Sequence, residues 1–210
     1  MRTDISFDWR SRISGLDYKK LIIIVFLLRL IMASAYDIYV NVTGEDPLVP
    51  DGIFYSMKGR YIDLLLQGYG KDSISWDLVP ADKKVQAAFL SVFMTHQGNL
   101  PRITGESIVH VYMIGVIYLV LGYATIWIRI LNVCLSILSV YMLFRVAKTY
   151  FGDLAANLFL LSALFLPTQF GYSITMSRDF LRLFIVSFMI WVVYNVGGIW
   201  LKKLRLRLYC

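Results

Sequence analysis

Apolar residues of the 210-residue chain gather in blocks rather than alternating with polar residues. The first block covers Leu21–Tyr36 and follows a polar segment at residues 1–20. Further blocks cover Ile108–Leu121, Ile126–Val146, Leu154–Tyr172 and Phe180–Trp200. An α-helix needs about 20 mostly apolar residues to cross a bilayer. Because most blocks approach that length, the pattern predicts an all-α, polytopic membrane helix bundle.

The composition excludes an ordinary water-soluble domain. Hydrophobic residues make up 58% of the chain and charged residues 17%, whereas soluble domains contain about 45–50% and about 25%. The net charge of +7 therefore indicates membrane topology, and no nucleic-acid partner is expected. The two cysteines, Cys134 and Cys210, are too few for a disulfide framework or a metal cluster.

The positions of the basic residues favour four membrane crossings over five. If all five blocks crossed, Arg145 and Lys148 would lie on the opposite side from the basic N-terminal segment, against the positive-inside rule. Ile108–Leu121 is short enough to lie in the interface or to re-enter. Four crossings then place residues 1–20 and the basic tail at 201–210 in the cytoplasm. For the first block, an uncleaved helix is favoured over a signal peptide.

An external loop at residues 37–125 follows the first transmembrane helix, at residues 21–36, and three further transmembrane helices occupy residues 126–200. The loop is predicted to hold two juxtamembrane helices, at about 52–67 and 108–121. The first has an apolar stripe formed by Phe54, Met57, Tyr61, Leu64 and Leu65, and a polar side formed by Ser56, Arg60, Asp63 and Gln67. Asp51 precedes this helix, where it fits both an N-cap and a catalytic carboxylate.

Arg178, Asp179 and Arg182 open the last apolar block. The two arginines are four residues apart and share a helix face that suits a phosphate. An interfacial ion pair, with Asp179 at a helix N-terminus, is the alternative. Charges at membrane depth tend to mark functional sites, and both interpretations stay open.

Two other arginines fall inside apolar blocks. Arg129 lies near the predicted outer end of its helix and is expected to extend to the lipid headgroups. Arg29 lies near the middle of the first block, where bonding to carbonyl groups of neighbouring helices is favoured over contact with a ligand. His96 and His110 have no neighbouring ligand at zinc spacing, so a zinc site is not expected.

The order of these features resembles the N-terminal half of the GT-C membrane glycosyltransferases, in the branch of the protein O-mannosyltransferases and aminoarabinose transferases. That branch has an Asp-x-x-x-Tyr motif in its first external loop, matched by Asp51 and Tyr55. Its later motifs are matched by Arg129-Ile130-Leu131, Phe151-Gly152, Pro167 and Arg178-Asp179. The family's usual second acidic residue after the loop Asp is Gly52 here, and family members are typically two to three times longer.

The resemblance implies transfer of a sugar from a polyprenyl-phosphate donor to an acceptor on the outer face. Asp51 is then the first candidate for the catalytic base and Asp37 the second, while Tyr55, Arg178, Asp179 and Arg182 bind substrate. A divalent cation, Mg²⁺ or Mn²⁺, is a candidate cofactor, and no metal ligand is assigned. The implied location is a bacterial inner membrane, with lipid and a membrane protein as partners.

Two other function classes are considered beside the enzyme. A non-catalytic membrane subunit could bind the lipid-linked sugar or scaffold a larger complex, and the short chain favours this interpretation. A channel or transporter is disfavoured because no inverted repeat is apparent and the apolar blocks contain few polar groups.

Overall fold

The computed structural model describes residues 17–43, 51–69 and 108–208, together with Ile13, Gly15 and Leu48. The predicted segments at residues 1–12, 70–107 and 209–210 lie outside the described residues. The described helices are α2 (Tyr18–Thr43), α3 (Asp51–Leu66), α5 (Ile108–Leu121), α6 (Ile126–Phe165), α7 (Pro167–Ser173) and α8 (Asp179–Leu208). These ranges contain no strand, and the predicted all-α fold is confirmed.

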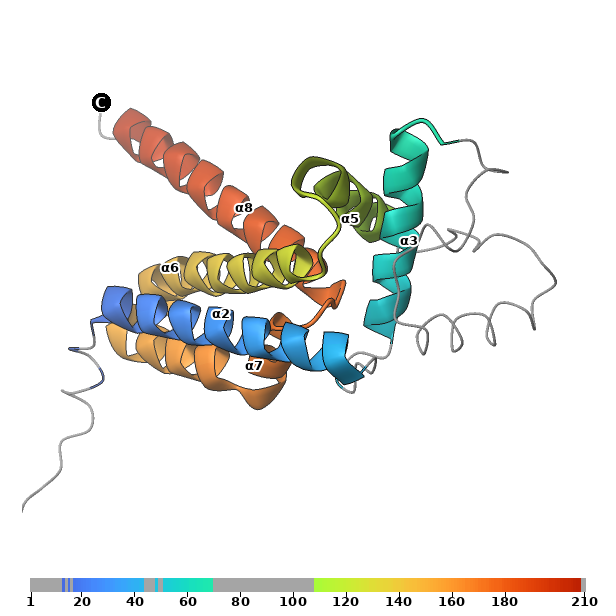
Figure 1. Cartoon of the computed structure of the whole chain (residues 1–210). Helices are drawn as coiled ribbons and strands as arrows, with labels where there is room; N and C mark the ends of the chain where they lie inside the picture. The colour runs from blue at the N-terminus through green and yellow to red at the C-terminus, as the bar shows by residue number, and fades with distance from the viewer. Residues whose placement is uncertain are drawn as a thin grey trace, which may run out of the picture.

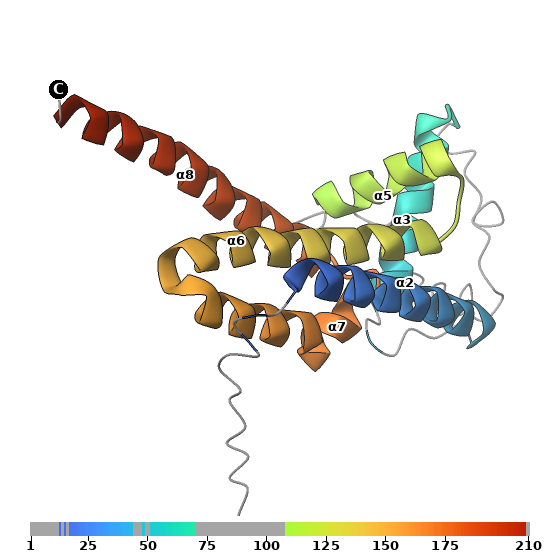
Figure 2. The ribbon, with the colours of Figure 1, turned by 90° about the vertical axis from the view of Figure 1, so that its left-hand side faces the viewer.

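Helix α2 lies along α6, which turns back on itself to form two arms (Figures 1 and 2). The turn is at Gly152, whose φ of 79° is in the left-handed region that favours glycine. A buried apolar cluster joins α2 to both arms; its members are Val25, Val140, Phe144, Ala156, Leu160 and Leu164. Helix α8 starts beside α6 and then diverges from the bundle (Figure 2).

Two predicted helix boundaries need correction. The block Leu154–Tyr172 is not one helix, because Leu166 is extended (φ −57°, ψ 122°) and Pro167 starts the separate helix α7. The proline ring disfavours the helical conformation in the residue before it. Helix α2 does not end at Tyr36 but continues to Thr43. Asp37, predicted as the first residue of an external loop, is therefore inside a helix.

Within the described ranges, three helices are long and apolar enough to cross a membrane by length and composition: Tyr18–Thr43, Ile126–Phe165 and Asp179–Gly197. Large apolar side chains are exposed on them, for example Val42 at 76% and Val193 at 71%. A solvated surface of this kind would be unfavourable, whereas lipid contact suits it. Helix α5 is also apolar but shorter.

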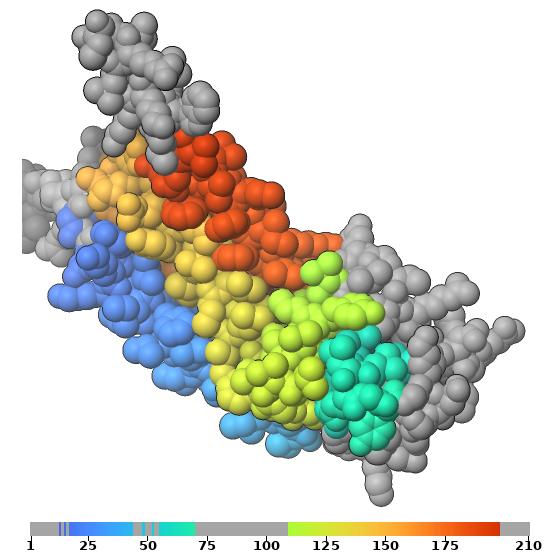
Figure 3. Space-filling model, turned by 90° about the horizontal axis from the view of Figure 1, so that it is seen from above, coloured from blue at the N-terminus to red at the C-terminus, as the bar shows by residue number. Residues whose placement is uncertain are grey.

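Helices α3 and α5 pack against each other at one end of the molecule (Figure 3). They approach closely because glycines face the partner helix: a Cβ at Gly59 would overlap Ile114, and one at Gly115 would lie 2.6 Å from Ile62. The polar side predicted for α3 is not a solvated face, since Ser56 is 3% exposed and Asp63 is fully buried. Asp63 is paired with Arg60 and accepts a hydrogen bond from Gln67.

Candidate functional site

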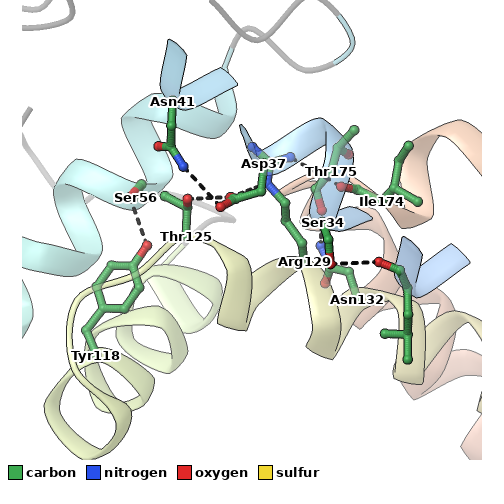
Figure 4. A network of polar contacts seen from close by, with 11 residues as sticks. Ser34, Asp37, Asn41, Ser56, Tyr118, Thr125, Arg129, Asn132, Ile174 and Thr175 are labelled. Carbon is green, nitrogen blue, oxygen red and sulfur yellow. Dashed lines mark hydrogen bonds and ion pairs between the residues drawn. The ribbon is translucent and has the colours of Figure 1, made fainter. Parts of the chain in front are cut away.

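The residues predicted to carry chemistry lie mostly at one end of the bundle, where α2 finishes and α6 and α8 begin. We call this end the polar end. It contains Asp37 on α2, Arg129 on α6 and the segment from Ile174 to Asp179 that leads into α8. Figure 4 shows that side chains from α2 and α6 meet there.

Asp37 and Arg129 form an ion pair at the polar end, with Nε of Arg129 2.9 Å from Oδ1 of Asp37 (Figure 4). The hydroxyl of Thr125 donates to the same oxygen at 2.5 Å, and the amide of Asn41 donates to Oδ2 at 3.0 Å. Arg129 is fully buried, and its guanidinium carbon lies 4.9 Å from the ring centroid of Tyr36. The prediction that Arg129 extends to the headgroups is therefore wrong, because a carboxylate on α2 neutralises it inside the bundle.

This pairing separates the two candidate bases. The carboxylate of Asp37 is 13% exposed and accepts hydrogen bonds from three side chains. A general base must reach the proton that it removes. The structure holds Asp37 as the partner of Arg129, so its geometry supports a structural role.

The same region of α6 fixes the segment before α8. Arg129 donates from Nη1 to the carbonyl of Ile174 at 3.2 Å. Asn132 donates from Nδ2 to the carbonyls of Thr175 and Ser177, at 2.8 and 3.0 Å. Two buried side chains thus bond three carbonyls directly ahead of Arg178. The sequence signal for Asn132 is its position three residues after Arg129, which places both on one helix face.

Arg178, Asp179 and Arg182 lie at the start of α8, as the spacing predicted. Asp179 is the first residue of the helix, and its backbone N–H donates to the hydroxyl of Ser177 at 3.2 Å. Nη1 of Arg182 lies 3.5 Å from Oδ1 of Asp179, with side chains 46% and 69% exposed. The ion-pair alternative is thus present in the structure, although exposed pairs of this kind contribute little stability. Binding of phosphate by the two arginines stays a prediction.

His110 connects α3 with the start of α8. Its ring and that of Tyr55 are edge to face with centroids 5.3 Å apart. His110 is 2% exposed, and neither ring nitrogen makes a well-oriented hydrogen bond among the described residues. Burial lowers the pKa of His110 from 6.5 to about 4; the positive charge of Arg178 also lowers it, while the nearby Met176 backbone and Asp179 oppose the shift. From the sequence, His110 was considered only as a zinc ligand and a zinc site was not expected, so its position beside Tyr55 was not predicted.

Two neighbouring cavities lie along α7. The first, of about 310 Å³, is lined by Thr168, Gln169, Tyr172, Asp179, Phe180 and Leu183. The second, of about 390 Å³, is lined by Leu48, Pro167, Thr168, Gly171 and Tyr172. Thr168 and Tyr172 line both cavities, so the two are adjacent, with Asp179 lining the first and Leu48 the second.

Asp51 is the first residue of α3, and its side chain lies outside the described part of the structure. Its capping and catalytic roles both stay predictions. The backbone nevertheless restricts its position. Leu48 lines the second cavity, and its N–H donates to the hydroxyl of Tyr36 at 3.2 Å. Three peptide units separate Leu48 from Asp51, so their Cα atoms are no more than about 11 Å apart.

Arg29 has the structural role predicted for it. It is fully buried and donates to the hydroxyl of Ser136 at 2.6 Å and to the carbonyl of Leu164 at 2.7 Å. Its guanidinium carbon also lies 5.3 Å from the ring centroid of Phe170. The prediction that Arg29 bonds neighbouring helices is correct. These contacts join α2 to both arms of α6.

No group of three His, Cys, Asp or Glu residues that could hold a metal ion occurs within the described ranges. A cation held by protein and substrate together needs fewer protein ligands, since Mg²⁺ commonly takes one or two carboxylates plus substrate phosphates. Asp179 is the exposed carboxylate that suits this arrangement, and the cation stays a prediction.

Comparison with protein-family models, curated proteins and solved structures finds no match to this chain. The structure itself therefore defines the class: an all-α helix bundle with three apolar helices of membrane-spanning length. Within this class, the chain has buried charges at the polar end and a closely packed pair of short helices beside it.

Proposed function

We propose that the chain is a membrane glycosyltransferase of the GT-C type, which transfers a sugar from a polyprenyl-phosphate donor to an acceptor hydroxyl at the outer membrane face. The observation that carries the proposal is the convergence of separate segments at the polar end. Tyr55 on α3 packs edge to face against His110 and shares a buried cluster with Met176, which precedes α8. Leu48, which precedes α3, lines the second cavity of α7. These are the segments that carry the motifs of the resemblance.

The chemistry assigns a different task to each charged group. The acceptor oxygen attacks the anomeric carbon, the bond from that carbon to the phosphate oxygen breaks, and the acceptor proton moves to a carboxylate. Asp51 is the proposed base, because Asp37 is occupied by Arg129. The departing phosphate requires cations close to the membrane surface, and the guanidinium groups of Arg178 and Arg182 suit it. Asp179 orients Arg182 through their ion pair.

The proposal includes an orientation in the membrane. Lys20, Arg145 and Lys148 lie at the end of the bundle opposite to the polar end, near the start of α2 and the Gly152 turn. Basic residues prefer the cytoplasmic side, so we place the polar end outside and the N-terminus in the cytoplasm. The two arms of α6 then cross separately, the second together with α7. With α2 and α8, this gives four crossings.

The test is transfer of radiolabelled sugar by the purified full chain in lipid nanodiscs, with polyprenyl-phosphate sugars as donors. Asp51→Asn removes the proposed base, so transfer should fall by at least about 100-fold, the lower range of general-base catalysis. Asp153→Asn is the matched control, because Asp153 is exposed at the opposite end, where it pairs with Lys148. Equal transfer by the Asp51 variant and the wild type would exclude Asp51 as the base.

One observation favours the alternative, a non-catalytic subunit that binds lipid-linked sugar or scaffolds a membrane complex. Helix α8 leaves the bundle (Figure 2), and its exposed apolar residues include Val186, Met189 and Val193. A partner helix could cover this surface as well as lipid does. A wild-type chain that binds the donor but transfers no sugar to any acceptor would support this alternative.

A further inference from the structure

The cavity between α7 and the start of α8 has a composition that suits a small polyhydroxylated ligand. Its lining includes three polar residues, Thr168, Gln169 and Asp179, and two apolar residues, Phe180 and Leu183. Tyr172, which is 46% exposed, adds an aromatic surface. Ligand pockets typically combine apolar walls with a few placed polar groups. A sugar ring offers the matching surfaces, hydroxyl groups at its edge and C–H groups on its faces.

Volume and charge restrict the ligand further. The cavity measures about 310 Å³, at the lower end of the range of about 300–1,000 Å³ for ligand pockets. This volume suits a single ring rather than a long lipid chain. The negative charge of Asp179, which lines the cavity, disfavours a phosphate group inside it unless a cation neutralises the two charges. A neutral, hydroxylated group is therefore the better occupant, and the phosphate belongs outside, toward the exposed Arg182.

Gln169 supplies an independent observation. Its Oε1 atom is buried and has no hydrogen-bond partner among the described residues. An unpaired buried acceptor destabilises the fold, because its hydrogen bond to water is lost and not replaced. A buried polar group that has no partner in the protein is a candidate for a hydrogen bond with a ligand. A ligand hydroxyl that donates to this amide would remove the cost, after a small movement of the side chain.

We propose that the cavity between α7 and α8 binds the sugar of the lipid-linked donor, with Gln169 hydrogen-bonded to a sugar hydroxyl. The assignment rests on the proposed function for the identity of the donor. It extends that function by naming α7 as the element that selects the sugar. The second cavity, through Thr168 and Tyr172, continues from this subsite toward Leu48 and the start of α3.

The experiment compares equilibrium binding of two probes to the full chain in detergent micelles. One probe is a short-chain polyprenyl phosphate carrying mannose, glucose or aminoarabinose, and the other is the same carrier phosphate without sugar. Wild type should bind at least one glycosylated carrier about tenfold more tightly than the bare carrier, which corresponds to about 1.4 kcal/mol. Gln169→Leu should remove most of this preference and leave binding of the bare carrier unchanged.

The leucine variant also separates ligand binding from folding. Replacing a side chain whose buried Oε1 atom is unpaired by an apolar group of similar size should leave the melting temperature nearly unchanged. Asn195→Leu is the matched control, because Asn195 donates only to the Trp191 carbonyl of its own helix among the described contacts. It lies about 24 Å along α8 from Asp179, at 1.5 Å per residue. This control should keep the preference for the glycosylated carrier.

Thr168→Phe is a second variant, designed to fill the cavity from a position that is exposed beside it. It should also abolish the preference for the glycosylated carrier. The proposal is overturned if Gln169→Leu keeps the wild-type preference, if Asn195→Leu loses it equally, or if wild type never prefers a glycosylated carrier. A chain that shows the preference but transfers no sugar would retain the subsite and remove the proposed enzymatic function.

Discussion

The α2–α6 seam and the α3–α5 pair are stabilised in opposite ways. The seam contains Arg29, Asp37, Arg129, Asn132 and Ser136, all on helices whose outer surfaces are apolar. The α3–α5 pair instead approaches through Gly59 and Gly115 and encloses a mostly apolar cluster. In a membrane, an apolar side chain is as stable against lipid as against another helix, so apolar contact alone does not determine which helix faces pack together. Directional polar bonds can then determine how helices align, whereas α3 and α5 rely on shape.

The largest effect is expected from separating the charges of the seam. Asp37→Ala leaves the fully buried Arg129 without its carboxylate, at a cost of about 3–5 kcal/mol in unfolding free energy. Thermal and denaturant unfolding of the detergent-solubilised chain measures this loss. Lys148→Ala is the control, because Lys148 and Asp153 form an ion pair whose side chains are 46% and 56% exposed. It should cost less than about 1 kcal/mol.

The double variant Asp37→Leu/Arg129→Met sharpens this test. Replacement of a buried ion pair by apolar residues is often neutral or stabilising, so the double variant should regain most of the stability lost in Asp37→Ala. It still lacks the bond from Arg129 to the Ile174 carbonyl. Restored stability with reduced transfer would show that the pair positions the segment before α8. Equal losses in the single variant and the exposed-pair control would contradict the importance of the seam.

The second effect concerns His110, the titratable group of the α3–α5 pair that faces α8. Its pKa is about 4 in the folded chain against 6.5 for the free side chain, mainly because of burial. The unfolded chain therefore binds a proton first as the pH falls. Above about pH 6.5 His110 is neutral in both states, and its burial does not make the unfolding free energy depend on pH. Between pH 6.5 and 4 only the unfolded chain takes up the proton, so the unfolding free energy falls by up to about 3 kcal/mol.

Unfolding measured across this pH range on two variants isolates the contribution. His110→Phe keeps an aromatic ring beside Tyr55 but cannot take up the proton, so its stability should decline less steeply than that of wild type. His96→Phe changes the chain's other histidine and measures how much of the wild-type slope depends on that residue instead. The groups that face His110 are Arg178 and Asp179, and both are retained in these variants. Identical slopes for all three proteins would exclude the buried neutral imidazole as the cause.

Much of the helical architecture could be predicted because it depends on local properties. Apolar block length predicted the α-helices, and the isolated charge in the first block correctly predicted the carbonyl contact of Arg29. The pairing of Asp37 with Arg129 could not be predicted, since 92 positions separate the two residues and hydropathy carries no information about partners. The burial of His110 could not be predicted for the same reason, because it depends on how α5 packs against α3 and the segment before α8.

The smallest effect tests the polar contact inside the α3–α5 pair. The hydroxyls of Ser56 and Tyr118 lie 2.8 Å apart and are buried. Tyr118→Phe should reduce the unfolding free energy by about 1 kcal/mol, because this buried hydrogen bond is lost while Tyr123 remains as a second hydroxyl partner of Ser56. Tyr194→Phe, which removes an exposed hydroxyl contact with Thr149, is the matched control with a smaller expected loss. If Tyr118→Phe cost as much as Asp37→Ala, the α3–α5 pair would depend on polar bonds as strongly as the seam, and the contrast between the two regions would not hold.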